Sequence, residues 1–257
     1  METAQLFIDR DWVMFTGRVD ALESHQNPAH ACLAGLDGPM TLADGGQAPA
    51  IWSLPAQSVP RVDARDTRLL QLLLAPHHPV ARQAWALGRA RGLQDPLPDA
   101  VAGCMKTMGT AISAGERAPE SLIQRLSASL PGPPPEPLDS RVTAAIRQLR
   151  DCPQPPLDLA ALEGVTGLAA PALRRLFRAQ LGVSVGRFRV WARIQELVMV
   201  LGASQTITEA ASRAGFRDPR QLARDFRMLF GLDASGVLRN AQPLAIRPRF
   251  DLQRATS

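Results

Sequence analysis

The sequence ITEAASRAGFRDPRQLARDFRMLFG, residues 207–231, predicts two short helices joined by a tight turn. Gly215 follows the first helix, and glycine adopts the left-handed conformation that ends a helix without a side-chain penalty. Asp218 then precedes Pro219, which is typical of a hydrogen-bond acceptor at a helix N-terminus followed by proline in the first turn. We therefore expect a second helix that runs to Phe230.

The two faces of this second helix differ in chemistry. Apolar residues at helical spacing should pack inward: Leu222, Phe226, Leu229 and Phe230. Polar and cationic residues should lie outward: Arg220, Gln221, Arg224 and Arg227. Two crossing helices with such a face fit a helix-turn-helix that reads the major groove, where arginine suits guanine and glutamine suits adenine. A solvated arginine face without a ligand is the alternative.

A second copy of this pattern lies upstream in LDLAALEGVTGLAAPALRRLFRAQLG, residues 157–182. It has a short helix, a turn at Gly167 and a further helix with Leu173, Leu176 and Phe177 inward. Its outward residues are Arg174, Arg175 and Arg178. The sequence therefore predicts two helix-turn-helix units, which we call the first and the second unit.

Between the two units, SVGRFRVWARIQELVMVLG, residues 184–202, has no helix breaker between Arg187 and Leu201. A helix of that length spans about 25 Å at about 1.5 Å per residue. With one unit at each end, it could set two recognition helices in successive major grooves, about 34 Å apart.

From Asp139 to about Arg239 the chain resembles the DNA-binding domain of the AraC/XylS transcription regulators. The resemblance rests on LRRLFRAQLGVS, on FRVWARI in the linking helix, and on the 207–231 sequence with its continuation LDAS. It implies an all-α domain of about seven helices with two helix-turn-helix units. The positions that match the family's DNA-contacting sites are Pro171, Arg174 and Arg175 in the first unit, and Pro219, Arg220, Gln221 and Arg224 in the second.

The first unit departs from the family pattern more than the second. Glu163 stands where a small residue is usual at the helix crossing, and Ala169 stands where a serine usually caps the recognition helix. Loss of a cap costs about 0.5 to 2 kcal/mol, so we expect a less rigid first unit. The second unit keeps its small residue at Ala211.

The N-terminal half predicts a different architecture. Residues 5–74 alternate short apolar runs with turns such as Asp37-Gly38-Pro39, which favours an antiparallel barrel or sandwich of about five to seven strands. Helical patterns follow at 81–91, 99–113 and 119–130. The fold class is therefore multidomain α+β. We expect a cupin-like sensor and dimerisation domain at 1–130, a Pro-rich linker at 131–138, the DNA-binding domain at 139–240 and a tail at 241–257.

Cupin-type sensor domains often carry metal-binding histidines, and this chain resembles them only weakly. His25 and His30 match that pattern, but Pro60 occupies the place of a further histidine, and two histidines without an evident third ligand do not make a metal site. His77 and His78 precede Pro79 and are expected in a loop. We therefore expect no metal and no cofactor.

Charge and composition limit the function classes. Residues 1–138 hold 11 basic and 14 acidic residues, a balance of −3, whereas residues 139–257 hold 18 basic and 10 acidic, a balance of +8. A basic C-terminal half suits a polyanionic partner. No apolar run of about 18 residues exists, so we expect a cytoplasmic protein without a membrane span. No nucleophile motif or converging acid–base set is present, which argues against an enzyme.

The sequence thus predicts an AraC-type transcriptional regulator that binds two successive major-groove segments of promoter DNA and activates transcription. RNA polymerase is an expected partner, and a small-molecule effector and a homodimer are further candidates. The alternative is an interaction module or anti-regulator whose helix-turn-helix domain has lost DNA binding, which Glu163 and Ala169 favour.

Overall fold

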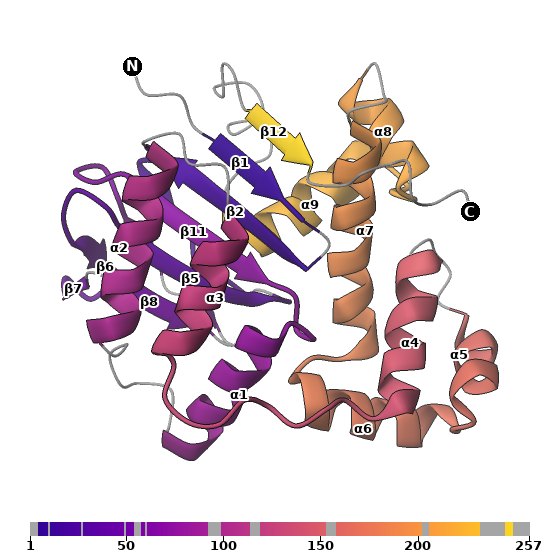
Figure 1. Cartoon of the computed structure of the whole chain (residues 1–257). Helices are drawn as coiled ribbons and strands as arrows, with labels where there is room; N and C mark the ends of the chain where they lie inside the picture. Colours follow the sequence, from indigo (N-terminus) through magenta and orange to yellow (C-terminus); the bar gives the residue numbers. More distant parts are fainter. Residues whose placement is uncertain are drawn as a thin grey trace.

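The computed structural model describes residues 5–9, 11–26, 28–48, 50–53, 58–59, 61–91, 99–113, 119–152, 158–201, 206–231 and 245–248. Strands dominate the N-terminal part and helices the C-terminal part (Figure 1). The α+β class with two differently built regions is confirmed. None of the described helices combines the length and the apolar character that a membrane crossing requires.

The described strands form three separate sheets. In chain order they are β1 (Gln5–Ile8), β2 (Trp12–Gly17), β3 (Ala21–Leu22), β4 (His25–Gln26), β5 (His30–Gly35), β6 (Met40–Leu42), β7 (Gln47–Ala48), β8 (Ala50–Ser53), β9 (Ser58–Val59), β10 (Val62–Asp63), β11 (Leu69–Leu74) and β12 (Ala245–Pro248). The sheet orders are β12-β1-β2-β11-β5-β8, β3-β10-β6-β7 and β4-β9.

The strand count differs from the expectation of about five to seven, because the described N-terminal part holds eleven strands, several of only two residues. Such short pairings leave almost no periodic pattern in the sequence. The sheets do not close into a barrel within the described residues.

The large sheet is buried on both faces. Along β2, Trp12 and Met14 pack with one cluster of apolar residues, and Val13 and Phe15 pack with another, as the two-residue period of a strand requires. The first cluster includes α1 (Pro79–Arg91), α2 (Asp99–Ser113) and α3 (Pro119–Ser129), which match the helices expected from the sequence. Helices from the C-terminal part cover the other face.

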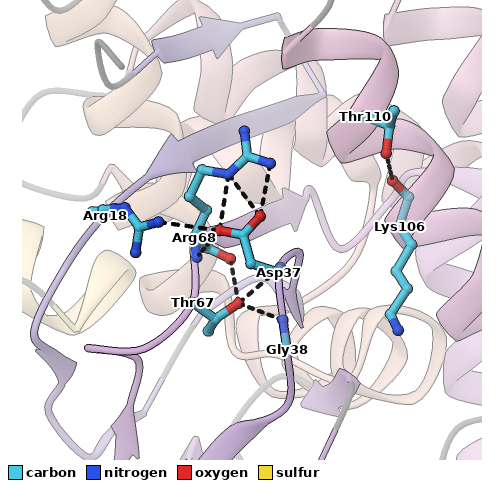
Figure 2. A network of polar contacts seen from close by, with 7 residues as sticks. All are labelled: Arg18, Asp37, Gly38, Thr67, Arg68, Lys106 and Thr110. Carbon is cyan, nitrogen blue, oxygen red and sulfur yellow. Dashed lines mark hydrogen bonds and ion pairs between the residues drawn. The ribbon is translucent and has the colours of Figure 1, made fainter. Parts of the chain in front are cut away.

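The turn signal at Asp37-Gly38 is confirmed between β5 and β6. Figure 2 shows the Asp37 carboxylate between the Arg18 and Arg68 guanidiniums. Arg68 Nη2 lies 2.8 Å from Asp37 Oδ1. Thr67 Oγ1 accepts hydrogen bonds from Asp37 N at 3.0 Å and Gly38 N at 3.2 Å. These contacts satisfy the turn's backbone donors and fix the register between β5 and β11.

The C-terminal helices are α4 (Ser140–Asp151), α5 (Leu159–Thr166), α6 (Ala170–Leu181), α7 (Val185–Leu201), α8 (Ile207–Arg213) and α9 (Pro219–Phe230). A seventh helix of the expected domain would fall within 232–240, outside the described residues. The Pro-rich segment at 131–138 has no helix or strand, and Gln83 Nε2 of α1 donates to Leu130 O at 3.3 Å beside it.

The chain's C-terminal segment returns to the N-terminal sheet. Strand β12 pairs in parallel with β1, with Gln5 opposite Ala245 and Ile8 opposite Pro248 (Figure 1). The segment expected as a tail therefore contributes an edge strand. Sequence patterns do not report this pairing, because the partner of a strand is chosen by tertiary contacts.

Candidate nucleic-acid interface

The second unit has the predicted turn. Thr206 caps α8 by accepting a hydrogen bond from Glu209 N at 3.1 Å. Gly215 takes a φ of 79°, in the left-handed region that favours glycine. Ala211 is buried, and its carbonyl accepts from Phe216 N at 2.9 Å. The chain therefore turns directly from α8 toward α9.

The start of α9 is capped from within the unit. Asp218 Oδ1 accepts from Gln221 N at 2.7 Å, and Gln221 Oε1 accepts from Arg217 N at 3.0 Å. This reciprocal arrangement resembles a capping box. Gln221 is half-buried and its amide oxygen already accepts a hydrogen bond. A bidentate contact with adenine would therefore have to share this oxygen or break the bond.

The other outward residues of α9 are placed as the sequence predicts. Pro219, Arg220, Arg224 and Arg227 are exposed, whereas the apolar face is buried. Each of the four apolar residues expected inward lies in the core: Leu222, Phe226, Leu229 and Phe230. Whether the outward residues contact DNA remains a prediction from the sequence.

The first unit makes a similar turn with different caps. Gly167 has a φ of 64°, and Thr166 Oγ1 accepts from Leu168 N at 3.3 Å. Ala169 is the N-cap of α6 and offers no side-chain hydrogen bond. Instead, Glu163 Oε1 accepts from Ala170 N at 2.6 Å. Glu163 and Ala169, the two departures from the family pattern, are therefore related: the Glu163 carboxylate accepts a hydrogen bond at the helix start where Ala169 cannot.

The outer face of α6 is exposed at Pro171, Arg174, Arg175 and Arg178. Counted from the N-caps Ala169 and Asp218, Arg175 and Arg178 occupy the same helical positions as Arg224 and Arg227. Arg220 and Gln221 correspond to Pro171 and Ala172. The first turn of α6 therefore lacks the long polar side chains that α9 presents there.

Helix α7 connects the two units, with α6 near one end and α8 near the other (Figure 1). A buried ion pair joins it to α9: Arg193 Nη2 lies 2.7 Å from Asp225 Oδ2, with side chains 4% and 8% exposed. The Arg193 guanidinium also lies 5.0 Å from the centre of the Phe216 ring. Burial raises the pKa of the Asp225 carboxyl, and the charge of Arg193 opposes that shift. The pair fixes the recognition helix on the linking helix.

Sequence reasoning missed this ion pair. Asp225 falls on the apolar face of α9 between Leu222 and Leu229, and a carboxylate at such a position signals a buried partner. Arg193 lies in the FRVWARI motif, but the sequence alone does not show which carboxylate it meets.

The apolar face of the second unit packs against the N-terminal sheet. A single cluster holds Phe15, Leu33 and Leu73 of the sheet together with Phe226 and Phe230 of α9. Trp191, Ile194 and Leu197 of α7 belong to the same cluster. The second recognition helix is thus part of the core of the N-terminal half.

Polar contacts hold the end of α9 on that sheet. Gln71, a buried polar residue in the otherwise leucine-rich β11, donates from Nε2 to Phe230 O at 3.3 Å. Glu23 N donates to Gly231 O at 3.0 Å. Gly231 has a φ of 66°, and a Cβ there would lie 2.6 Å from the His25 ring, so glycine is required by both conformation and space. A lone glutamine in an apolar strand was the available sequence signal.

The first unit has its own core and a polar link to the N-terminal half. Leu173 and Phe177 of α6 pack with Val142 of α4 and Phe188 of α7. Arg150 Nη1 of α4 lies 3.0 Å from Asp11 Oδ1, and His77 Nε2 lies 3.0 Å from the same oxygen. His77 lies in the turn before α1, which confirms the expected loop position, and its side chain also takes part in this link.

The two candidate metal-type histidines have no third ligand beside them among the residues that the structure describes. His30 is fully buried in β5, and burial lowers the pKa of its imidazole to about 3. His25 Nδ1 lies 2.7 Å from Glu23 O, and burial lowers its pKa as well. Within the described residues, no group of three histidine, cysteine or carboxylate side chains could hold a metal ion. Pro60 lies outside the described residues.

Residues 162–240 match a family model described as a helix-turn-helix domain. The C-terminal half carries an AraC-type helix-turn-helix domain. ToxT from Vibrio cholerae, a solved structure, is 10% identical with a TM-score of 0.54, over 91% of this chain and 100% of that one. This likeness extends the shared fold to both halves. No curated protein matches the chain.

Two further solved structures are similar. A "probable AraC family transcriptional regulator" from Rhodopseudomonas palustris is 28% identical over 41% of this chain and 100% of that chain, with a TM-score of 0.37. ToxT bound to (E)-4-(8-methylnaphthalen-1-yl)but-3-enoic acid is 7% identical over 90% of this chain and 99% of that chain, with a TM-score of 0.51. The domain match thus places a helix-turn-helix domain at residues 162–240, and the likeness to ToxT concerns the fold alone.

Proposed function

We propose that this protein is a sequence-specific DNA-binding transcriptional regulator of the AraC type, and an activator, whose helices α6 and α9 enter successive major-groove segments. The observation that carries the proposal is the outer face of α9. Its arginines are exposed while its apolar face is buried within a helix-turn-helix unit. A recognition helix requires one face that packs in the core and another that is exposed to solvent.

Two further observations support binding through both units. Helix α7 has 17 residues, which corresponds to about 25 Å. The outer face of α6 presents arginines at the same helical positions as Arg224 and Arg227. RNA polymerase and a second copy of the chain remain predicted partners. The ToxT complex makes a small apolar acid the first effector class to test.

The experiment is selection of binding sites from a random duplex library with the full chain. The full chain is required because the apolar face of α9 packs against the N-terminal sheet. Arg220 lies in the first turn of α9, where side chains reach base edges, and Arg227 lies about two turns further on. Arg220→Ala should cost about 1 to 3 kcal/mol on the selected site and relax preference at one or two base pairs.

Arg227→Ala is the matched control. Loss of a phosphate contact should weaken binding to all sequences about equally and lower the salt slope by about one. Identical selected sequences for wild type and Arg220→Ala would contradict base reading by α9. Affinity that does not change between about 50 and 200 mM salt would favour the interaction-module alternative.

A further inference from the structure

The backbone amides at the start of α6 lack the usual capping side chain. A helix has four N–H groups without intrahelical partners at its N-terminus, and a side chain at the N-cap usually accepts from one of them. The N-cap here is Ala169, which has no acceptor, and Pro171 has no N–H. Ala170 is at the first helical position, and its amide is one of the donors that the helix itself cannot satisfy.

Glu163 satisfies this donor from the preceding helix. Its Oε1 accepts from Ala170 N at 2.6 Å, while its backbone carbonyl accepts from Gly167 N at 2.8 Å. Glu163 thus accepts one hydrogen bond at the C-terminus of α5 through its main chain and one at the N-terminus of α6 through its side chain. A carboxylate at this place also suits the positive end of the α6 dipole.

The second unit needs no such contact. Asp218 caps α9 locally, and Ala211, which corresponds to Glu163, has an apolar side chain in the core. In the first unit, the side-chain acceptor lies at Glu163, six residues upstream of the N-cap position where the family pattern places it. The glutamate at the helix crossing and the missing serine are therefore one compensated change.

We propose that Glu163 is the positioning residue of the first recognition helix, and that the first unit binds DNA in the orientation that this carboxylate sets. The inference rests on the proposed function. Under this proposal the first unit binds DNA and has a different helix cap. It is not a copy that has lost DNA binding.

The test compares Glu163→Ala with Glu163→Gln in the full chain. Both variants remove the charge, but glutamine keeps an oxygen that can accept from Ala170 N, so their difference isolates the hydrogen bond. The duplex is the site that wild type selects from a random library. Glu163→Ala should bind it about two- to thirtyfold more weakly than Glu163→Gln, as expected for the loss of a cap.

Two more readouts make the result specific to α6. Hydroxyl-radical footprints should lose protection only over the half-site of the first unit, and amides of residues 168–177 should exchange faster in Glu163→Ala than in Glu163→Gln. Adding Ala169→Ser, which restores a local cap, should return the affinity of Glu163→Ala to within about threefold of Glu163→Gln. Asp218→Ala is the matched control and should affect the other half-site.

Equal affinity and equal exchange for Glu163→Ala and Glu163→Gln would overturn the proposal. A Glu163→Ala/Ala169→Ser double variant as weak as Glu163→Ala alone would overturn the capping role. If wild type selects no duplex, the proposed function fails, and the exchange comparison still decides whether Glu163 positions α6.

Discussion

The second helix-turn-helix unit packs into the core of the N-terminal sheet, whereas the first unit keeps a core of its own. Phe226 and Phe230 of α9 share a cluster with β2 and β11, while Phe177 of α6 lies in a separate cluster with residues of helices α4 to α7. The first unit and its neighbouring helices α4 and α7 meet the N-terminal half through the Arg150–Asp11 ion pair, the His77–Phe188 ring contact and the contact of α1 with α6. Two units with one sequence pattern therefore have different environments.

Phe230→Ala tests this difference most strongly. Truncation of a buried phenylalanine costs about 3 to 5 kcal/mol, through lost transfer energy and the cavity that remains. Because Phe230 packs against the sheet, we expect faster amide exchange in β2 and β11 as well as in α9. Mass spectrometry of hydrogen exchange on the full chain measures this.

Phe177→Ala is the matched change in the first unit. We expect a similar local loss of stability, with faster amide exchange confined to α4–α6 and the start of α7, where Phe188 contacts Phe177. If Phe177→Ala also loosened β2 and β11, the two cores would not be separate, and the comparison between the units would fail.

The ion pair between α7 and α9 should rank second. Asp225→Ala leaves the Arg193 guanidinium buried without its carboxylate, and breaking a buried pair costs about 3 to 5 kcal/mol. Part of this cost should be relieved here, because Arg193 also lies against the Phe216 ring. Urea unfolding of the full chain measures the decrease in the free energy of unfolding.

Replacing both partners of the ion pair tests whether stability depends on the pair itself or only on leaving no buried charge unpaired. Arg193→Leu/Asp225→Leu removes the unpaired charge, and buried pairs replaced by apolar residues are often neutral or more stable. The double variant should therefore be more stable than Asp225→Ala. A double variant that is less stable than the single one would show that the pair contributes more than mutual neutralisation.

The sequence predicts the helices of both units well, because their signals are local. Gly215 and Gly167 take positive φ values as expected, and α9 begins at Pro219 after the Asp218 cap. The apolar period in the α9 sequence identified its buried face. Exposure of the candidate DNA-binding arginines followed from the same pattern, since the opposite face of an amphipathic helix must lie outside the core.

What the sequence does not show depends on contacts between distant residues. Gln71 meets Phe230 across 159 positions, and Arg150 meets Asp11 across 139. Glu163 and Ala169 each departed visibly from the family pattern, but only the fold shows that they compensate. The N-terminal strands were undercounted because two-residue pairings carry no period, and β12 was missed because its partner lies at the other end of the chain.

The smallest expected effect concerns the link between the first unit and the N-terminal half. Burial raises the pKa of the Asp11 carboxyl, but the His77 hydrogen bond and the charges of His77 and Arg150 outweigh it and hold the pKa at about 2. A lowered carboxyl pKa gives stability that is present above the unfolded value of 3.8 and is lost as pH falls toward about 2. Because Asp11 is partly exposed, solvent screening reduces its contribution to about 1 kcal/mol.

Asp11→Asn should therefore lower the free energy of unfolding by about 1 kcal/mol at pH values near neutral, and the difference from wild type should shrink as pH falls through the acid range. Exchange in α4 should rise while exchange in α9 stays unchanged. Asp63→Asn is the control, because Asp63 pairs with its near neighbour Arg65 and joins no separate parts of the fold. If Asp11→Asn and Asp63→Asn gave the same exchange pattern, the ion pair would not be what holds the first unit in place, and its contacts through α1 would be the remaining link.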